Sequence, residues 1–118
     1  MYKNNCWVFK NRPLEDRIKE SKKMREAYPD KIPIIIDNEK RIENITKFKF
    51  LIPGTLTVSN LLNCIRNIIK LDKDKAIFIF VGNDTIPSST SSINGIYQEY
   101  ANEDGFLYVK VFLESTFG

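Results

Sequence analysis

Side chains that usually do chemistry are scarce in this sequence. Its 118 residues include no histidine, so the usual general base of Ser-His-Asp and Cys-His catalysis is missing. The cysteines Cys6 and Cys64 lie far apart without metal-ligand spacing, and the apolar helical pattern around Cys64 predicts a buried thiol. We interpret neighbouring carboxylates such as Glu103 and Asp104 as solubilising charge. The sequence therefore predicts a protein that is not an enzyme and holds no metal or cofactor.

The end of the chain suggests chemistry of another kind. The last five residues are ESTFG, so the final group is the carboxylate of Gly118. Glycine has no side chain, so its terminal carboxylate is unhindered and its backbone adopts conformations closed to other residues. Two interpretations stay open at this point: a reactive terminus and a frayed one.

Length and composition indicate one globular domain. The 118 residues are 42% hydrophobic and 28% charged, which is ordinary for a chain with a single core. No apolar run is long enough to span a bilayer, and the N-terminus lacks a signal peptide's pattern, so we expect a cytosolic protein. The net charge of +3 is mild. Lysine and arginine gather in the N-terminal half, which suits acidic peptides, anionic membrane or nucleic acid, or is simply a solvated helix face.

The first half of the chain predicts one helix and two strands. Pro13 suits the first turn of a helix that must end before Pro29. The expected inward face of this helix consists of Leu14, Ile18, Met24, Ala27 and Tyr28. KIPIIID predicts a strand in which Pro33 indicates an edge, an end or a bulge. KFKFLIP then alternates like a half-buried strand.

The second half predicts a long helix, a strand, a short helix and a last strand. Thr57 is a candidate N-cap for the long helix, whose apolar face comprises Leu61, Leu62, Ile65, Ile68 and Ile69. KAIFIFVGND is a nearly continuous apolar run, which predicts a strand buried on both faces and ended by a turn. INGIYQEY predicts the short helix, and EDGFLYVKVFL a turn and the final strand.

This order of elements predicts an α+β fold, a roll of the ubiquitin-like β-grasp type. We expect an N-terminal arm or short helix over residues 1–12 and the ubiquitin-like domain, with its N-terminal helix, over residues 13–113. Residues 114–118 are expected to form a flexible tail that leaves the sheet.

Six segments, taken in order and at their separations, resemble the autophagy-related protein 8 family. This family of ubiquitin-like modifiers includes light chain 3 and GABA-receptor-associated protein. The segments are YPDKIPIII, KFKFLIPGTLTV, KAIFIFV, IYQEY, EDGFLYV and ESTFG, and the resemblance covers the chain from Pro13 to Gly118. It implies a ubiquitin-like core with additional N-terminal helical structure.

The resemblance also implies that Gly118 is the residue of lipid attachment. Activating and conjugating enzymes would pass its carboxylate from an adenylate to cysteine thioesters and then to the amine of phosphatidylethanolamine on autophagic membranes. A cysteine protease that processes and delipidates such chains is a further implied partner. Arg66 matches a helix arginine of the family that either orients the tail for processing or merely covers the helix surface. We expect a monomer that does not bind nucleic acid.

A second implied activity is the binding of cargo receptors and adaptors through aromatic-x-x-aliphatic motifs, by strand addition at an edge from Lys47 to Ile52. The implied aromatic pocket consists of Glu20, Met24, Pro33, Lys49, Leu51 and Phe106. The implied aliphatic pocket consists of Phe50, Ile52, Pro53, Leu56, Leu61 and Cys64. Contacts along the docking strand and to the acidic flank of the motif would come from Lys47, Phe48, Arg25 and Lys31. The alternative for the apolar members, above all Leu61 and Phe106, is that they are simply core.

Some features depart from the family pattern. Cys64 stands in place of a larger aliphatic residue, and Phe48 in place of a basic one, which adds an exposed aromatic to the docking strand. The loop NEKRIENIT is short, Gly82 resembles an insertion, and the N-terminal arm carries Trp7. Two other functions remain open: a non-covalent trafficking or cytoskeletal adaptor that uses the same groove, and a sulfur carrier. The Phe-Gly end argues against the sulfur carrier.

Overall fold

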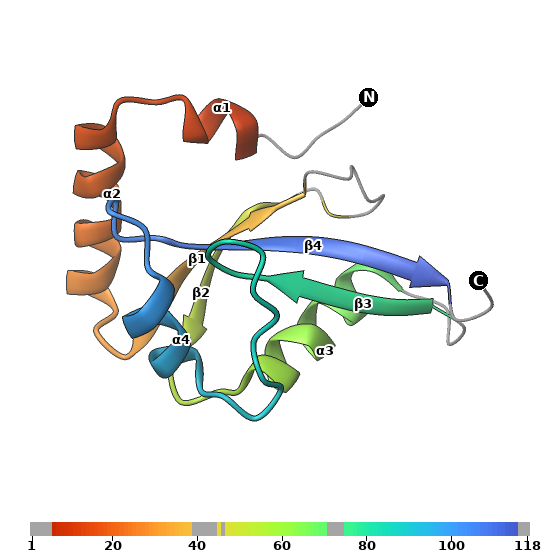
Figure 1. Cartoon of the computed structure of the whole chain (residues 1–118). Coiled ribbons are helices and arrows are strands. Elements are labelled where there is room, and N and C mark those ends of the chain that lie inside the picture. The colour runs from red at the N-terminus through yellow and green to blue at the C-terminus, as the bar shows by residue number, and fades with distance from the viewer. Residues whose placement is uncertain (1–5, 39–44, 46, 71–74, 116–118) are drawn as a thin grey trace.

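The computed structural model describes residues 6–38, 45, 47–70 and 75–115. The elements follow one another as α1 (Cys6–Lys10), α2 (Leu14–Ala27), β1 (Lys31–Asp37), β2 (Lys49–Pro53), α3 (Val58–Ile69), β3 (Lys75–Phe80), α4 (Ile93–Tyr100) and β4 (Leu107–Ser115). The strands form one four-stranded sheet in the order β2-β1-β4-β3, with a parallel central pair and antiparallel outer pairs (Figure 1). Two antiparallel strand pairs around one long helix confirm the expected ubiquitin-like roll, and α1 and α2 form its N-terminal extension.

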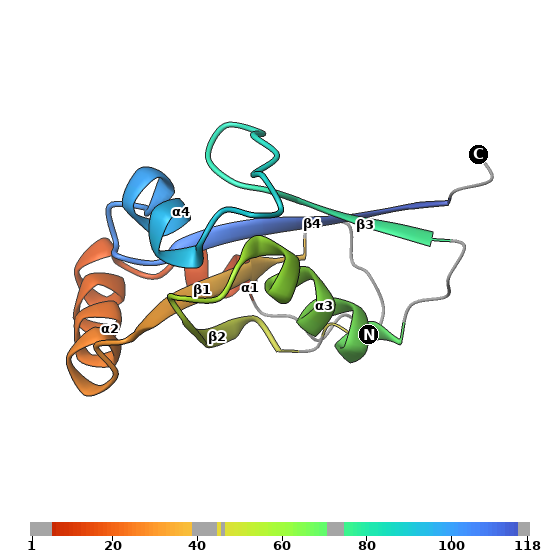
Figure 2. The same cartoon turned by 90° about the horizontal axis from the view of Figure 1, so that it is seen from below.

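The main core fills the space between the sheet and the helices α3 and α4 (Figure 2). Alternate residues of the central strands, such as Ile34 and Val109, point into it. From α3 come Leu61, Ile65 and Ile69, one helical turn apart, as expected for an apolar stripe. The same helix starts at the predicted cap, because the Thr57 side chain accepts a hydrogen bond from the backbone N–H of Asn60. Ile68, expected inside, is 41% exposed.

A smaller aromatic cluster lies on the opposite face of the sheet, beneath α1. Cys6 and Phe9 of this short helix are buried together with Ile35 and Phe106. The rings of Phe9 and Phe106 meet edge to face with their centroids 5.2 Å apart. The N-terminal arm is therefore, over Cys6–Lys10, the short helix that was one of its two expected forms. Trp7 points away from the cluster and is 73% exposed.

β1 is an interior strand although it contains a proline. Pro33 pairs with Leu51 of β2, while pairing with β4 on the other side begins only at Ile34, opposite Leu107. The missing N–H of Pro33 therefore falls before the parallel ladder starts and interrupts no hydrogen bond there. Pro33 thus lies neither on an edge strand nor at the end of β1, but directly before the start of the parallel pairing.

β3 is an outer strand, so the expectation of burial on both faces was wrong. Ile77 and Ile79 are buried in the main core, whereas Phe78 and Phe80 on the other face are only half-buried. Phe80 packs edge to face against Phe112 of β4, with 4.8 Å between ring centroids. A continuous apolar run predicts two covered faces, but here the outward aromatic rings cover one another instead.

The apolar face predicted for α2 is only partly present. Ile18, Ala27 and Tyr28 are exposed, whereas Leu14 and Met24 are half-buried and Met24 packs against the aromatic cluster. The one buried residue of the helix is Ser21, which donates a hydrogen bond of 2.5 Å to the backbone carbonyl of Asp104. Polar contacts and the packing of Met24 thus hold α2 against the end of the sheet.

Asp104 is the centre of these contacts, and its interpretation as solubilising charge was wrong. Its side chain is fully buried and accepts hydrogen bonds from Arg17 at 2.8 Å, from the Tyr108 hydroxyl at 2.5 Å and from the backbone N–H of Phe106 at 2.9 Å. Burial, and then the hydrogen bond to Asp104, raise the pKa of Tyr108. One carboxylate therefore ties α2 to β4 and fixes the backbone of Phe106.

Candidate functional site

The outer edge of β2 is the place where a peptide strand could be added. In the sheet order β2 is an edge strand, paired only with β1 among the described residues. The strand begins at Lys49, two residues later than expected, although Ile36 still donates a 2.7 Å hydrogen bond to the carbonyl of Phe48. A row of backbone donors and acceptors along such an edge is a template for strand addition.

Alternation along β2 sends the residues of the two implied pockets to opposite faces of the sheet. Lys49 lies on the side of α1 and α2, where its ammonium is 2.5 Å from the Glu20 carboxylate and 4.7 Å from the centroid of Phe9. Phe50 and Ile52 point the other way and pack against the main core under α3. Lys49 of the implied aromatic set therefore lies on the opposite face of the edge strand from Phe50 and Ile52 of the implied aliphatic set.

On the α2 side, charged groups border an apolar floor. Glu20 joins Lys49 to Arg12, whose guanidinium lies 3.1 Å from the second carboxylate oxygen. Below them lie the half-buried Met24 and the fully buried Phe106, while Pro33 is buried in β1. Phe106 is itself core in this structure, as the alternative interpretation of this residue expected.

On the α3 side, the residues of the implied aliphatic pocket differ in exposure. Phe50, Ile52 and Leu56 are half-buried and pack on the core, whereas Leu61 is a core residue with 3% exposure. Cys64 is exposed, so the expected buried thiol was wrong. The core-facing positions of α3 recur at 61, 65 and 69, and position 64 lies about 60° to one side of that stripe.

The side chains expected to meet an acidic flank are dispersed. Lys47 is exposed, with its ammonium 5.1 Å from the Phe50 ring, beside the edge strand. Arg25 instead faces the Tyr97 ring at 5.2 Å. Phe48, expected to be exposed, is half-buried and packs on Phe9 with centroids 5.7 Å apart. Phe48 therefore helps to hold α1 on the sheet, because its ring packs against the aromatic cluster beneath this helix.

The last described residues belong to the sheet. β4 continues to Ser115, two residues beyond the expected limit of the domain, and Ser115 pairs with Lys75 at the start of β3. Arg66 of α3 donates a hydrogen bond of 3.3 Å to the carbonyl of Lys75. This arginine thus lies beside the point where β4 ends. Gly118 lies outside the described residues.

The described part of the chain contains no group of three or more metal-ligating cysteine, aspartate or glutamate side chains. No helix among the same residues combines the length and apolar character needed to cross a bilayer.

The roll, its N-terminal helices and the two-sided edge strand define the class of the protein as ubiquitin-like. Residues 16–118 match the family model described as "Autophagy protein Atg8 ubiquitin like", and the chain belongs to this family of autophagy proteins. Autophagy-related protein 8c of Arabidopsis thaliana is 46% identical over 108 residues, which cover 90% of each chain. Autophagy-related protein 8 of Mycosarcoma maydis is 44% identical over 114 residues, covering 94% of this chain and 96% of the relative. The crystal structure of Trypanosoma brucei ATG8 superposes with a TM-score of 0.78 at 35% identity, covering 92% of this chain and 94% of that one.

Proposed function

We propose that this protein is a modifier joined through the Gly118 carboxylate to the amine of phosphatidylethanolamine on autophagic membranes. The observation that supports this most is the family match, which extends through residue 118. The chain acts as a substrate in this reaction, not as its catalyst. Cysteine thiolates of the activating and conjugating enzymes supply the nucleophile that its own sequence does not. The two acyl chains of the lipid then hold the protein on the membrane.

The edge strand supports the second half of the proposal, the recruitment of receptors with aromatic-x-x-aliphatic motifs. In an extended peptide, residues three apart point to opposite faces. The residues around Lys49 and those around Phe50 also lie on opposite faces of β2. A peptide that extends the sheet beyond β2 would therefore direct its aromatic residue towards α2 and its aliphatic residue towards α3.

Reconstitution tests the conjugation. The protein is incubated with the family's activating and conjugating enzymes, ATP and phosphatidylethanolamine liposomes, and intact mass is measured. We expect a gain of one lipid, which Gly118→Ala abolishes and Thr116→Ala preserves. Equal lipidation of the Gly118→Ala chain would refute the role of the glycine. Membrane recruitment of a chain without Gly118 would instead favour a non-covalent adaptor.

Peptide spacing tests the groove separately from conjugation. Peptides with one, two or three residues between the aromatic and the aliphatic side chain are titrated by calorimetry. The spacing of two should bind best, since the other two spacings direct both side chains to the same face. Tightest binding of either other spacing would contradict strand addition at β2.

A further inference from the structure

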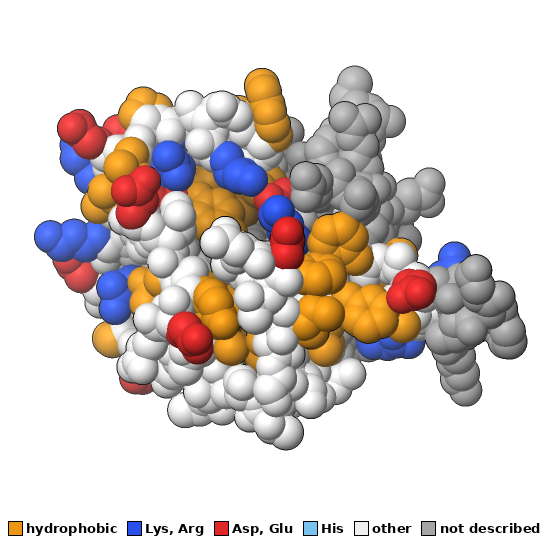
Figure 3. Space-filling model, in the orientation of Figure 1, with side chains coloured by type: hydrophobic (Ala, Val, Ile, Leu, Met, Phe, Trp, Pro, Cys, Tyr) orange, Lys and Arg blue, Asp and Glu red, His pale blue; other side chains and the backbone are white. Residues whose placement is uncertain are grey.

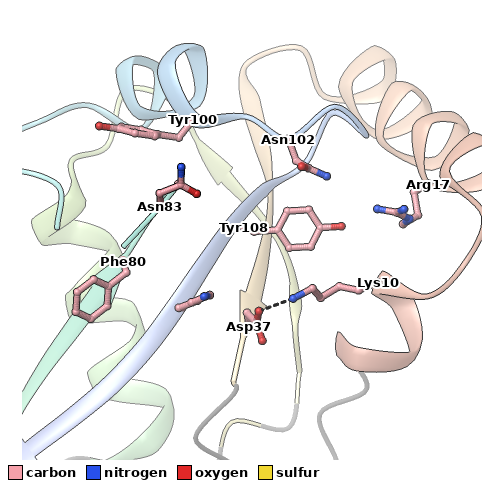
Figure 4. Close-up of a pocket in the computed structure, with 10 residues that line it drawn as sticks. Lys10, Arg17, Asp37, Phe80, Asn83, Tyr100, Asn102 and Tyr108 are labelled. Atoms are coloured by element: carbon pink, nitrogen blue, oxygen red, sulfur yellow. Dashed lines mark hydrogen bonds and ion pairs between the residues drawn. The ribbon is translucent and has the colours of Figure 1, made fainter. Parts of the chain in front are cut away.

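A cavity of about 340 Å³ lies away from the edge strand, on the face of the sheet that carries α1 (Figure 4). Tyr108 of β4 lies at its centre, between Lys10 and Arg17 on one side and Asn83 and Tyr100 on the other. The complete lining is Lys10, Arg17, Asp37, Phe80, Gly82, Asn83, Tyr100, Asn102, Tyr108 and Lys110. None of these residues belongs to the implied peptide pockets.

Strand register builds the floor of this cavity. Lys110 of β4 is flanked by Asp37 of β1 and by Phe80 of β3, so three strands contribute one row of side chains. Tyr108, two residues earlier in β4, continues the floor on the same face. The turn after β3 closes one side, where Gly82 has a φ of +56° and its Cα hydrogens face the Tyr100 ring. A Cβ there would lie 2.7 Å from that ring, so a glycine is required for this close approach.

The polar groups around the cavity are mainly hydrogen-bond donors. Three basic side chains face one acidic side chain in the lining, and Asn83 and Asn102 add amide groups. Figure 3 shows basic side chains beside a recess with an apolar floor on this face. The one lining carboxylate, Asp37, already accepts a hydrogen bond of 2.8 Å from Lys10.

Two of the basic groups are held in place before any ligand arrives. Asp37 fixes the Lys10 ammonium, and the Arg17 guanidinium is fixed by Asp104 at 2.8 Å and by the carbonyl of Arg12 at 3.1 Å. The third cation is Lys110, whose ammonium lies 3.9 Å from the exposed Asp84 carboxylate and whose side chain is 36% exposed. Because ordering a long side chain costs free energy on binding, the fixed positions of Lys10 and Arg17 favour binding.

We propose that this cavity binds a phosphate ester carried on a compact ring. Phosphate accepts hydrogen bonds from lysine, arginine and amide groups and is strongly bound by charge-assisted contacts. The faces of Tyr108, Phe80 and Tyr100 offer apolar surface to the ring that bears it. A volume of about 340 Å³ is at the lower end of ligand sites, large enough for one ring and its phosphate and too small for a folded peptide.

The same chemistry could reach the cavity from solution or from a membrane. A soluble inositol phosphate and the headgroup of a phosphoinositide share the ring and the phosphate. For a protein attached to a membrane, the second source would add a lipid contact distant from the chain terminus.

Titration of the full chain, followed by NMR chemical shifts of its backbone amides, tests the proposal. The probes are inorganic phosphate, a soluble inositol phosphate, a phosphopeptide, and phosphatidylcholine vesicles with or without a phosphoinositide. We expect saturable shifts of the Asp37, Asn83 and Lys110 amides with the inositol phosphate and weaker binding of inorganic phosphate. Lys110→Gln should weaken binding about tenfold, the factor that ~1.4 kcal/mol of lost charge-assisted bonding gives. Lys19→Gln, an exposed lysine of α2 outside the cavity, should change affinity less than about twofold.

Equal affinity for the soluble and the vesicle-borne headgroup assigns the site to a soluble ring phosphate, and tighter vesicle binding that Lys110→Gln removes assigns it to a lipid. The proposal is overturned if cavity amides show no saturable shift, or if Lys19→Gln weakens binding as much as Lys110→Gln. Binding of a phosphopeptide alone, without the inositol phosphate, would also overturn it.

Discussion

Replacing Asp104 by alanine is the most demanding test of how the N-terminal helices are attached. The carboxylate is completely buried and accepts hydrogen bonds from Arg17, Tyr108 and the backbone of Phe106. Removing it leaves a largely buried guanidinium and a hydroxyl without their acceptor. Breaking a buried ion pair from one side destabilises a protein by about 3–5 kcal/mol. Since domains of this size have a total stability of about 5–15 kcal/mol, the variant should lose a large part of its margin.

Urea unfolding followed by circular dichroism measures the loss. With a slope of about 1.5–2 kcal/mol per molar urea, the midpoint should fall by about 2 M. The neighbouring Glu103→Ala is the matched control, because Glu103 is exposed, and it should change stability by less than about 0.5 kcal/mol.

A double-mutant cycle with Arg17→Ala then isolates the interaction free energy between Arg17 and Asp104. We expect the two losses to be strongly non-additive, because either substitution alone breaks the same contact. A loss below about 1 kcal/mol for Asp104→Ala, or simple additivity with Arg17→Ala, would refute the reasoning that a buried charge attaches α2 to the sheet.

Three further predictions concern other parts of the molecule. Burial raises the pKa of the Cys6 thiol from 9.0 to about 12, whereas Cys64 is exposed. Under native conditions at pH 8, a maleimide should therefore modify only Cys64, which peptide mapping would show. Modification of Cys6 at the same rate would contradict its burial. Because the folded state keeps the thiol proton of Cys6 to a higher pH than the unfolded state, the free energy of unfolding should fall as the pH rises above about 9. In urea titrations at several pH values, Cys6→Ala should make this fall less steep. An unchanged pH dependence would exclude Cys6 as its source. Thr57→Ala removes the cap of α3 and should cost about 1 kcal/mol, whereas Thr55→Ala, at an exposed position before the helix, should cost less than about 0.5 kcal/mol; equal losses would contradict the capping role.

Local patterns in the sequence predicted the elements well. The Thr57 cap, most of the predicted apolar stripe of α3 and the prolines that flank α2 act over one or two turns, and the structure contains each of them. The order of elements then leaves few ways to cover a small sheet, so the ubiquitin-like roll could also be predicted.

Features that depend on distant partners were not predictable in this way. The apolar run in β3 has the same composition whether the strand is central or outer, and its place in the sheet is decided by β4. In the sequence, Asp104 cannot be told from a surface carboxylate. Its partners are Arg17, which lies in α2 far away in the sequence, and Tyr108 in β4, and only the fold brings the three side chains together. The sequence around Asp104 indicated only a turn, EDG, before the final strand.

The candidate site shows the same division. The family resemblance assigned Lys49 to one pocket and Phe50 and Ile52 to the other, and alternation along β2 places them on opposite faces. The exposure of Cys64 and the packing of Phe48 against Phe9 depend on how α3 and α1 lie on the sheet. Single-residue patterns carry no information about those orientations.

The proposed function requires that the Gly118 carboxyl group is the one joined to the lipid amine. Tandem mass spectrometry of the reconstituted conjugate locates the bond directly. We predict that phosphatidylethanolamine is found on the C-terminal fragment, in amide linkage to Gly118 and nowhere else. A lipid adduct on an internal side chain, or no adduct in the complete reaction, would contradict this prediction.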